Sequence, residues 1–219
     1  MRKDTIIFDL DGTLLNTLED LTDGVNHTLR QWGFQERSMQ EIRRALGNGA
    51  RRLIELSLPE EVSASELEQV LKDYETYYQA HCHIKTRAYD GIPKLLEELK
   101  GRQVKTAIIS NKGDGAVGEL NRQYFSEYIS TAQGVREGIR RKPSPDAVLE
   151  ALKKLGSSPK DAVYVGDTEV DYETAKNAGM DCVLVSWGFR DREQLELLQP
   201  DLLIDAPVEL LRWLNCEKK

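Results

Sequence analysis

The 219-residue sequence contains only three cysteines, and Cys82, Cys182 and Cys216 are far apart along the chain. This spacing provides no disulfide framework and is typical of a protein in a reducing compartment. The chain also has no apolar run that approaches the length of a membrane span, and residues 1–4 lead almost at once into a strand. We therefore expect a cytoplasmic protein that has no membrane partner.

Basic residues are outnumbered, because 30 Lys and Arg face 37 Asp and Glu and leave a net charge of -7. A general nucleic-acid binder needs a clustered basic face, so this balance argues against nucleic acid as a partner. Histidine is scarce as well, and two of the three histidines flank Cys82. His81, Cys82 and His83 alternate at the end of a helical pattern without a matching second cluster, so we interpret them as linker residues rather than a metal site.

The hydrophobic pattern divides the chain into two kinds of sequence. Between about residues 16 and 85 no convincing strand is found, and apolar residues recur at helical spacing. From Tyr89 onward, helical and strand patterns alternate, which is typical of a parallel sheet with helical crossovers. The expected helices cover 91–100, 114–124, 145–155, 169–178 and 207–214, and the expected strands cover 104–110, 128–131, 162–165, 182–185 and 202–204.

A first strand ending at Asp9 has the character of the later strands but is separated from them by the helical block. The economical interpretation is that this strand belongs to the same sheet and that the block is an excursion from it. We predict an α/β fold with a Rossmann-like parallel sheet core, formed by residues 1–15 and 86–219. Residues 16–85 then form an inserted all-helical cap domain.

The segment Ile6–Thr13 (IIFDLDGT) is an apolar strand that ends in two acids, Asp9 and Asp11. A carboxylate at the tip of a buried strand is costly unless it meets a cation, a hydrogen-bond donor or a reaction. An ordinary Asp-Gly turn is the simpler alternative. Ligands of open parallel sheets bind beyond the carboxyl ends of the strands, so the other strand ends decide between the two.

Polar residues follow the later strands as well. One strand ends in Ser110-Asn111-Lys112, a basic turn covers 140–145, and another strand leads into Asp167 and Asp171. Ser110 as a helix cap, the basic run as a solvated loop, and the two acids as an N-terminal helix cap are the structural alternatives. Capping alone does not explain two acids four residues apart, because like charges at that spacing cost about 0.2–0.5 kcal/mol.

Four acids gathered at one crevice would repel each other, since a charge pair at 4 Å is worth about 4 kcal/mol at an effective dielectric constant of 20. A hard divalent cation removes that conflict, and Mg²⁺ is the best candidate because it favours a few carboxylates and retained waters. Ser110 and Lys142 would supply a hydroxyl donor and a positive charge on the opposite side. This combination suits a phosphoryl group, whose oxygens must be held and neutralised during transfer.

These motifs, in this order, resemble the four motifs of the haloacid dehalogenase-like hydrolase superfamily. Within it the chain is most similar to phosphoglycolate phosphatases and their relatives with a helical cap after the first strand. The segments that carry the resemblance are Asp9–Thr13, Ser110, Lys142-Pro143, Gly166-Asp167 with Asp171, the cap stretch Ala45–Ala50, and Trp187–Arg190 near the C-terminal end.

The resemblance implies that Asp9 attacks phosphorus and forms an aspartyl-phosphate. Asp11 would protonate the leaving alkoxide and then activate the hydrolytic water. Magnesium would be bound by the Asp9 carboxylate, the Asp11 backbone carbonyl and Asp167, with Asp171 as a ligand or as an anchor behind the ligands.

Under the same resemblance, Ser110 and Lys142 would bind the phosphoryl oxygens, and Asn111 is a further candidate substrate contact. The implied activity is a magnesium-dependent phosphatase acting on a small phosphorylated metabolite, with phosphoglycolate as the best guess. The expected protein is a monomer or a weak dimer.

Four other functions are alternatives to this one. A β-phosphoglucomutase-like isomerase or a pyrophosphatase of the same superfamily would use the same acids. A receiver-type binding switch is disfavoured because a helical block of about seventy residues has no place in it. A non-catalytic relative is disfavoured because the core set is intact, namely Asp9, Asp11, Ser110, Lys142 and Asp167.

Two features of the predicted cap bear on the substrate. Many relatives carry an acid where this chain has Asn16, near the expected hinge, so the metal surroundings or cap closure would differ there. Four arginines around residues 45–50 are suited to a carboxylate, although a glycine-ended helix with exposed arginines explains them equally well. These are Arg43, Arg44, Arg51 and Arg52.

Overall fold

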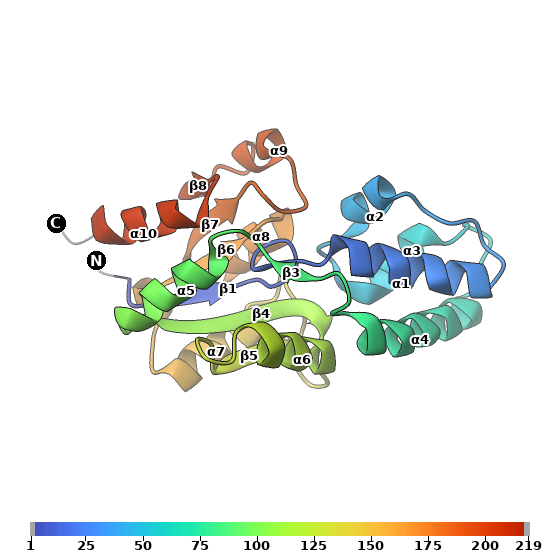
Figure 1. Ribbon diagram of the computed structural model, residues 1–219, viewed down its shortest axis with the longest axis horizontal. Coiled ribbons are helices and arrows are strands. Elements are labelled where there is room, and N and C mark those ends of the chain that lie inside the picture. The colour runs from blue at the N-terminus through green and yellow to red at the C-terminus, as the bar shows by residue number, and fades with distance from the viewer. Residues whose placement is uncertain (1–2, 217–219) are drawn as a thin grey trace.

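The core of the protein is a six-stranded, entirely parallel sheet, described by a computed structural model that covers residues 3–216 (Figure 1). The predicted α/β class is therefore confirmed. Strand β1, which leads directly into the first acidic motif, lies in the middle of the sheet. The strand order is β5 (Thr131–Val135), β4 (Lys105–Gly113), β1 (Thr5–Phe8), β6 (Ala162–Gly166), β7 (Asp181–Val185) and β8 (Leu202–Ile204).

Helices cover both faces of this sheet. Ile6 and Phe8 of β1 belong to one apolar cluster and Ile7 to another, because successive side chains of a strand point to opposite faces. A sheet buried on both faces needs continuous apolar strands, as found here. The first face packs against α5 (Ile92–Gly101), α6 (Asp114–Tyr124) and α10 (Pro207–Cys216), and the second against α7 (Asp146–Leu155), α8 (Glu169–Ala178) and α9 (Arg192–Glu196).

Strand β5 differs from the sequence prediction, which placed a short strand at 128–131. Residues before Thr131 form a turn instead, in which the backbone N–H of Ile129 donates to the Phe125 carbonyl at 2.8 Å. Both side chains are buried. Phe125 and Ile129 are four residues apart, which places both on one side of the turn and gives the segment an apolar pattern without a strand.

Strand β4 continues beyond its predicted end at Ser110 as far as Gly113. Its pairing with β5 is irregular, because Ile109 lies opposite Gln133 and Gly113 lies opposite Val135. An advance of four residues along β4 therefore corresponds to an advance of two residues along β5. The surplus residues form a bulge, a feature that redirects side chains at strand ends.

A short antiparallel ladder connects the sheet to the helical segment, and the sequence pattern did not predict it. It pairs β2 (Leu15–Asn16) with β3 (Arg87–Ala88), so Asn16 lies where the chain leaves the sheet. Between them lie α1 (Leu18–Gln31), α2 (Met39–Ala45), α3 (Gly49–Ser57) and α4 (Ala64–His81), with no strand among residues 17–86. We call residues 18–81 the helical insertion; Figure 1 shows it to one side of the sheet. That residues 16–85 act as a separate cap domain stays a prediction.

Two of these helices begin at capping motifs that are visible in the sequence. Ser38 and Glu41 form a reciprocal capping box at the start of α2, as do Ser63 and Glu66 at the start of α4. None of the helices described over residues 3–216 is long and apolar enough to cross a membrane.

The connection to the sheet is anchored by a buried acid. Asp20 of α1 accepts hydrogen bonds from the backbone N–H groups of Lys85 and Thr86, at 2.9 and 2.8 Å. These bonds satisfy the buried carboxylate and tie the first helix of the insertion to the segment that returns to the sheet.

Candidate active site

A cavity of about 590 Å³ lies between the carboxyl ends of the central strands and the helical insertion. The insertion contributes apolar side chains to its wall, including Leu21, Leu53 and Leu71. The predicted site residues Asp9, Asp11, Ser110, Asn111, Lys142 and Asp171 all line it, and Asp167 has a carboxylate oxygen within 4.8 Å of those of Asp9 and Asp171. The structure therefore brings every predicted site residue to one place.

Asp9 follows the last residue of β1, and its backbone N–H continues the ladder by donating to the Val165 carbonyl at 2.9 Å. Its side chain is buried, and Oδ1 lies 2.6 Å from Nζ of Lys142. Burial raises the pKa of Asp9 to about 7; Lys142 opposes the shift, while Asp171 and Asp11 add to it. A carboxylate held at a strand tip in a crevice with a perturbed pKa is typical of a functional site.

Asp167 lies directly after β6 and is completely buried. Thr13 Oγ1 donates to its Oδ1 at 3.1 Å, and the backbone N–H of Phe189 donates to its Oδ2 at 2.7 Å. Two glycines make room for it: a Cβ at Gly12 would lie 2.3 Å from Oδ2, and one at Gly188 would lie 2.4 Å from the Asp167 Cβ. Burial and the nearby carboxylates of Asp171 and Asp9 hold the pKa of Asp167 well above its usual range.

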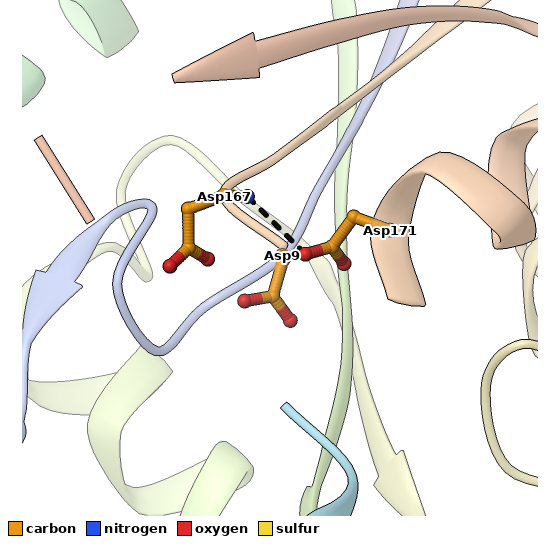
Figure 2. Close-up of side chains that lie close together, drawn as sticks. All are labelled: Asp9, Asp167 and Asp171. Carbon is orange, nitrogen blue, oxygen red and sulfur yellow. Dashed lines mark hydrogen bonds between the residues drawn. The ribbon is translucent and has the colours of Figure 1, made fainter. Parts of the chain in front are cut away.

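Figure 2 shows the carboxylates of Asp9, Asp167 and Asp171 turned toward one region, with oxygen atoms of the three within 4.8 Å of one another. Burial and mutual repulsion penalise the ionised form of Asp9 and Asp167, as their raised pKa values indicate. A hard divalent cation that takes oxygen ligands would relieve this repulsion. The donor set therefore fits the predicted Mg²⁺.

Asp171 differs from the other two acids because its oxygens are already occupied. Oδ2 accepts hydrogen bonds from the backbone N–H groups of Asp167 and Thr168 and from the Thr168 hydroxyl, at 2.8–3.2 Å. Oδ1 lies 2.7 Å from Lys142 Nζ and accepts from the Tyr164 hydroxyl at 3.3 Å. Of the two predicted roles, this bonding favours the anchor behind the ligands.

Lys142 lies between Asp9 and Asp171, two of the clustered acids, and contacts both. Its buried ammonium donates to Asp9 at 2.6 Å, to Asp171 at 2.7 Å and to the Tyr164 hydroxyl at 3.1 Å. Burial alone would lower the pKa of Lys142, but the Asp171 and Asp9 carboxylates outweigh it and hold the pKa well above its usual value. The lysine is therefore a fixed positive charge beside the predicted nucleophile.

The bulge in β4 directs Ser110, Asn111 and Lys112 into the cavity wall, and all three are buried. Ser110 Oγ accepts from the Lys112 N–H at 3.2 Å, which leaves its hydroxyl hydrogen for an incoming oxygen. Asn111 Nδ2 instead donates to the carbonyls of Gly47 and Lys142, both at 3.1 Å. The amide hydrogens of Asn111 thus bind backbone, and its role as a substrate contact stays a prediction.

Asp11 makes a contact that the sequence did not predict. Its Oδ1 lies 2.9 Å from Nζ of Lys112, and the same Nζ donates to the hydroxyl of Tyr78 at 2.8 Å. Tyr78 belongs to α4 of the insertion and Lys112 to β4 of the sheet. The lysine was visible as part of Ser110-Asn111-Lys112, whereas no local signal pointed to Tyr78.

The arginines proposed for a carboxylate mostly have partners of their own. Arg43 pairs with Asp191 at 2.9 Å, Arg52 with Glu55 at 3.2 Å, and Arg51 with Glu68. Of the four, only Arg51 lines the cavity among the described residues. The suitability of these arginines for a substrate carboxylate stays a prediction, and it now falls on Arg51, because Arg43 and Arg52 pair with acids away from the cavity wall.

The tripeptide around Cys82 also has structural contacts. The His81 ring stacks on Tyr77, which in turn stacks on His27, and the Cys82 side chain is buried.

The family model of the haloacid dehalogenase-like hydrolases matches residues 6–185. The chain belongs to this family. It is 31% identical to the phosphoglycolate phosphatase of Aquifex aeolicus, over 96% of each chain, and 27% identical to the pyrophosphatase PpaX of Bacillus cereus, over 98% of each. The crystal structure of a phosphoglycolate phosphatase-like protein from Lactobacillus delbrueckii subsp. bulgaricus superposes with a TM-score of 0.90 at 34% identity, covering 96% of this chain and 97% of that one.

The resemblance drawn from the motifs is thus confirmed, and so is its phosphoglycolate phosphatase-like subgroup. The chain belongs to these hydrolases and is similar to phosphatases over most of its length, so it is a phosphatase. The cavity at its strand ends holds the predicted acids Asp9 and Asp11 together with Ser110 and Lys142.

Proposed function

We propose that the protein is a magnesium-dependent phosphatase that hydrolyses a small phosphomonoester through an aspartyl-phosphate on Asp9. One observation carries this proposal: Asp9 lies at the tip of the central strand, at the cavity wall, with a fixed ammonium 2.6 Å from one of its oxygens. The ammonium neutralises part of the negative charge that would otherwise repel an approaching phosphate.

In the first step an Asp9 oxygen forms a bond to phosphorus while the bond from phosphorus to the alkoxide breaks. The alkoxide takes the electron pair and receives a proton from Asp11. In the second step a water oxygen attacks phosphorus and gives a proton to Asp11, and the Asp9 carboxylate leaves with the bonding electrons. Asp11 suits both transfers because its side chain lines the cavity and is 17% exposed.

Asp9 and Asp167 are the carboxylates we assign to the metal, together with the Asp11 backbone carbonyl, while Asp171 holds Lys142 and the Asp167–Thr168 backbone. Bound Mg²⁺ supplies charge neutralisation for the phosphoryl oxygens. The Ser110 hydroxyl binds a phosphoryl oxygen from the side of β4. The Lys142 ammonium does so from the 140–145 turn by exchanging its hydrogen bond to Asp9 for one to the phosphoryl group. These donors are buried, so their attraction for a phosphate is screened little by water.

The insertion forms the far wall of the cavity, so we assign the choice of leaving group to it. Phosphoglycolate is the first candidate, supported by relatives of that name at 31 and 32% identity. For its carboxylate, Arg51 is the insertion's candidate among the arginines around the loop, since it lines the cavity. Its ion pair with Glu68 would have to open or be shared.

The experiment is a steady-state comparison of phosphoglycolate, hexose phosphates, nucleotides and pyrophosphate, read as phosphate release in the presence of Mg²⁺. We expect kcat/KM for phosphoglycolate to exceed the others. A preference of about ten-fold, or about 1.4 kcal/mol, for another member would remove phosphoglycolate and leave the phosphatase. A hexose phosphate that is isomerised without phosphate release would instead support the mutase alternative.

Pyrophosphatase activity is the second candidate, favoured by the match to PpaX over 98% of both chains. Pyrophosphate carries no apolar part and would have to be bound by cations, whereas Leu21, Leu53 and Leu71 form part of the cavity wall. The pyrophosphate arm of the same comparison decides this candidate.

A further inference from the structure

Lys112 of β4 contacts both Asp11, the proposed general acid, and Tyr78, which lies on α4 of the helical insertion. Its Nζ lies 2.9 Å from Asp11 Oδ1 and 2.8 Å from the Tyr78 hydroxyl, and it also lies over the Tyr78 ring, 4.4 Å from its centroid. The Lys112 side chain is only 5% exposed. A buried ammonium is costly without partners, so these two contacts determine where Nζ lies.

The contact with Asp11 distinguishes the two oxygens of that carboxyl group. Oδ1 is fully buried against Lys112 and has no hydrogen bond of good geometry there, so the contact is an ion pair. The side chain as a whole keeps 17% of its surface exposed in the cavity wall. Lys112 therefore holds Oδ1 inward and leaves Oδ2 as the oxygen that can face a leaving group.

The position of Lys112 depends in turn on the bulge. A regular strand alternates its side chains between the two faces, so neighbouring residues of β4 could not all line one cavity. The bulge after Ile109 lets Ser110, Asn111 and Lys112 do so. Gly134 of β5 permits this close approach, because a Cβ there would lie 2.4 Å from the Lys112 carbonyl oxygen.

We propose that Lys112 is a positioning residue for Asp11, and that the Tyr78 hydroxyl couples it to the helical insertion. Lys112 keeps its own proton throughout. It fixes Asp11 so that Oδ2 delivers its proton to the alkoxide as the bond from phosphorus to that oxygen breaks. Because Tyr78 lies on α4, the carboxyl group is held in this orientation when the insertion lies against the sheet as it does here.

The inference rests on the proposed function and predicts which substrates suffer when Lys112 is changed. An alkoxide leaves poorly unless it is protonated, whereas the carboxylate released from acetyl phosphate needs no proton. Loss of the positioning ammonium should therefore slow hydrolysis of an alkyl phosphate far more than hydrolysis of acetyl phosphate. A general loss of structure would slow both alike.

The test compares kcat/KM on phosphoglycolate, or the best alkyl phosphate of the substrate panel, with kcat/KM on acetyl phosphate. For Lys112→Met we expect a fall of about 10- to 100-fold on the alkyl phosphate, part of what a general acid contributes. On acetyl phosphate the fall should be several-fold smaller. Lys112→Arg keeps the cation and should restore part of the alkyl phosphate rate.

Tyr78→Phe removes only the hydroxyl and keeps the buried ring. It should also lower kcat/KM more on the alkyl phosphate than on acetyl phosphate, by a smaller factor than Lys112→Met. Tyr77→Phe is the matched control, since it makes the same change one residue earlier on α4, outside the cavity wall. Lys94→Met, on the exposed side of α5, is the control for loss of a lysine. Neither control should change either rate.

The outcomes separate the two claims. If the wild-type enzyme hydrolyses neither substrate, the proposed function fails. If the wild type is active and Lys112→Met loses both activities to the same extent or neither, the positioning role is wrong. Should Lys112→Met fail to fold, the selectivity of Lys112→Arg and Tyr78→Phe decides in the same way, with thermal unfolding as the check on each variant.

Discussion

The Arg190 guanidinium donates a hydrogen bond to the backbone carbonyl of Leu46 at 2.9 Å, which ties the segment after β7 to the loop between α2 and α3. The next two carbonyls of that loop are bound in the same manner. Asn111 donates to the Gly47 carbonyl at 3.1 Å, and Arg141 donates to the Asn48 carbonyl at 3.2 Å. Three consecutive carbonyls of the insertion thus accept hydrogen bonds from side chains that lie outside it.

These three bonds connect the insertion to the segments around the cavity, so weakening one should lower the population of the arrangement seen here. Arg141→Met should raise KM by about five-fold, since an intramolecular hydrogen bond contributes about 1 kcal/mol. The Michaelis constant and kcat are measured separately on the best substrate. Arg140→Met, one residue earlier, is the control, because the Arg140 guanidinium binds Asp146 rather than the loop. A variant whose KM equals that of the control would show that the loop needs no such bond.

Asp9→Asn should abolish turnover and leave the fold intact. The amide removes the attacking oxygen anion, but it keeps the size of the side chain and relieves the repulsion among the buried acids. We expect phosphate release below detection and a melting temperature no lower than that of the wild type in metal-free buffer. Retention of wild-type activity by a protein of verified sequence would rule out the aspartyl-phosphate.

Lys142→Met should be destabilising as well as inactive. It would leave Asp9 and Asp171 buried without the ammonium that lies 2.6 and 2.7 Å from them. Removal of one partner from a buried charge cluster costs about 3–5 kcal/mol, measured as the free energy of unfolding in urea without added Mg²⁺. Lys94→Met removes an exposed lysine and should change this free energy little. Equal stabilities for the two variants would contradict the structural role of Lys142.

The sequence predicted the acids of the site because their signal is local. Asp9 and Asp167 each follow a buried, continuously apolar strand. In a parallel sheet the carboxyl ends of neighbouring strands lie at the same edge, and this does not depend on the conformation of the loops. The same reasoning placed β6, β7 and β8 within one residue of their observed bounds.

What the sequence could not predict depends on contacts between distant segments. The Tyr164 hydroxyl contacts a lysine 22 residues away in the sequence, and the Tyr78 hydroxyl contacts one 34 residues away. A local sequence pattern does not indicate contacts over such separations. The bulge in β4 is likewise decided by its partner strand. The ion pairs of Arg43 with Asp191 and of Arg51 with Glu68 likewise join different segments, so the sequence did not predict them.

Gly134→Ala tests whether the bulge holds the site together. A Cβ there would lie 2.4 Å from the Lys112 carbonyl oxygen and 2.6 Å from Asp114 Cα, both backbone atoms that have to move. We expect a loss of about 1–3 kcal/mol in the free energy of unfolding and a large fall in kcat/KM, because Ser110 and Lys112 shift with the bulge.

Gly118→Ala is the matched control for this substitution. A Cβ at Gly118 would meet nothing within 4 Å, and the residue lies inside α6. This variant should be more stable by about 1 kcal/mol, the helix preference of alanine over glycine, and fully active. If Gly134→Ala behaves like Gly118→Ala, the bulge does not depend on the glycine.

Magnesium should bind the folded protein and stabilise it even without substrate. At a concentration of about 100 times Kd the stabilisation is about 2.7 kcal/mol, which for a chain of this size raises Tm by about 5–10 °C. Asp167→Asn should lose most of this shift, because the amide replaces a carboxylate assigned to the metal. Glu173→Gln removes a negative charge from the exposed side of α8 and should keep the full shift. A shift in Asp167→Asn as large as in Glu173→Gln would mean that the cation binds elsewhere, since the two variants lose the same charge and differ in whether the carboxylate belongs to the buried cluster.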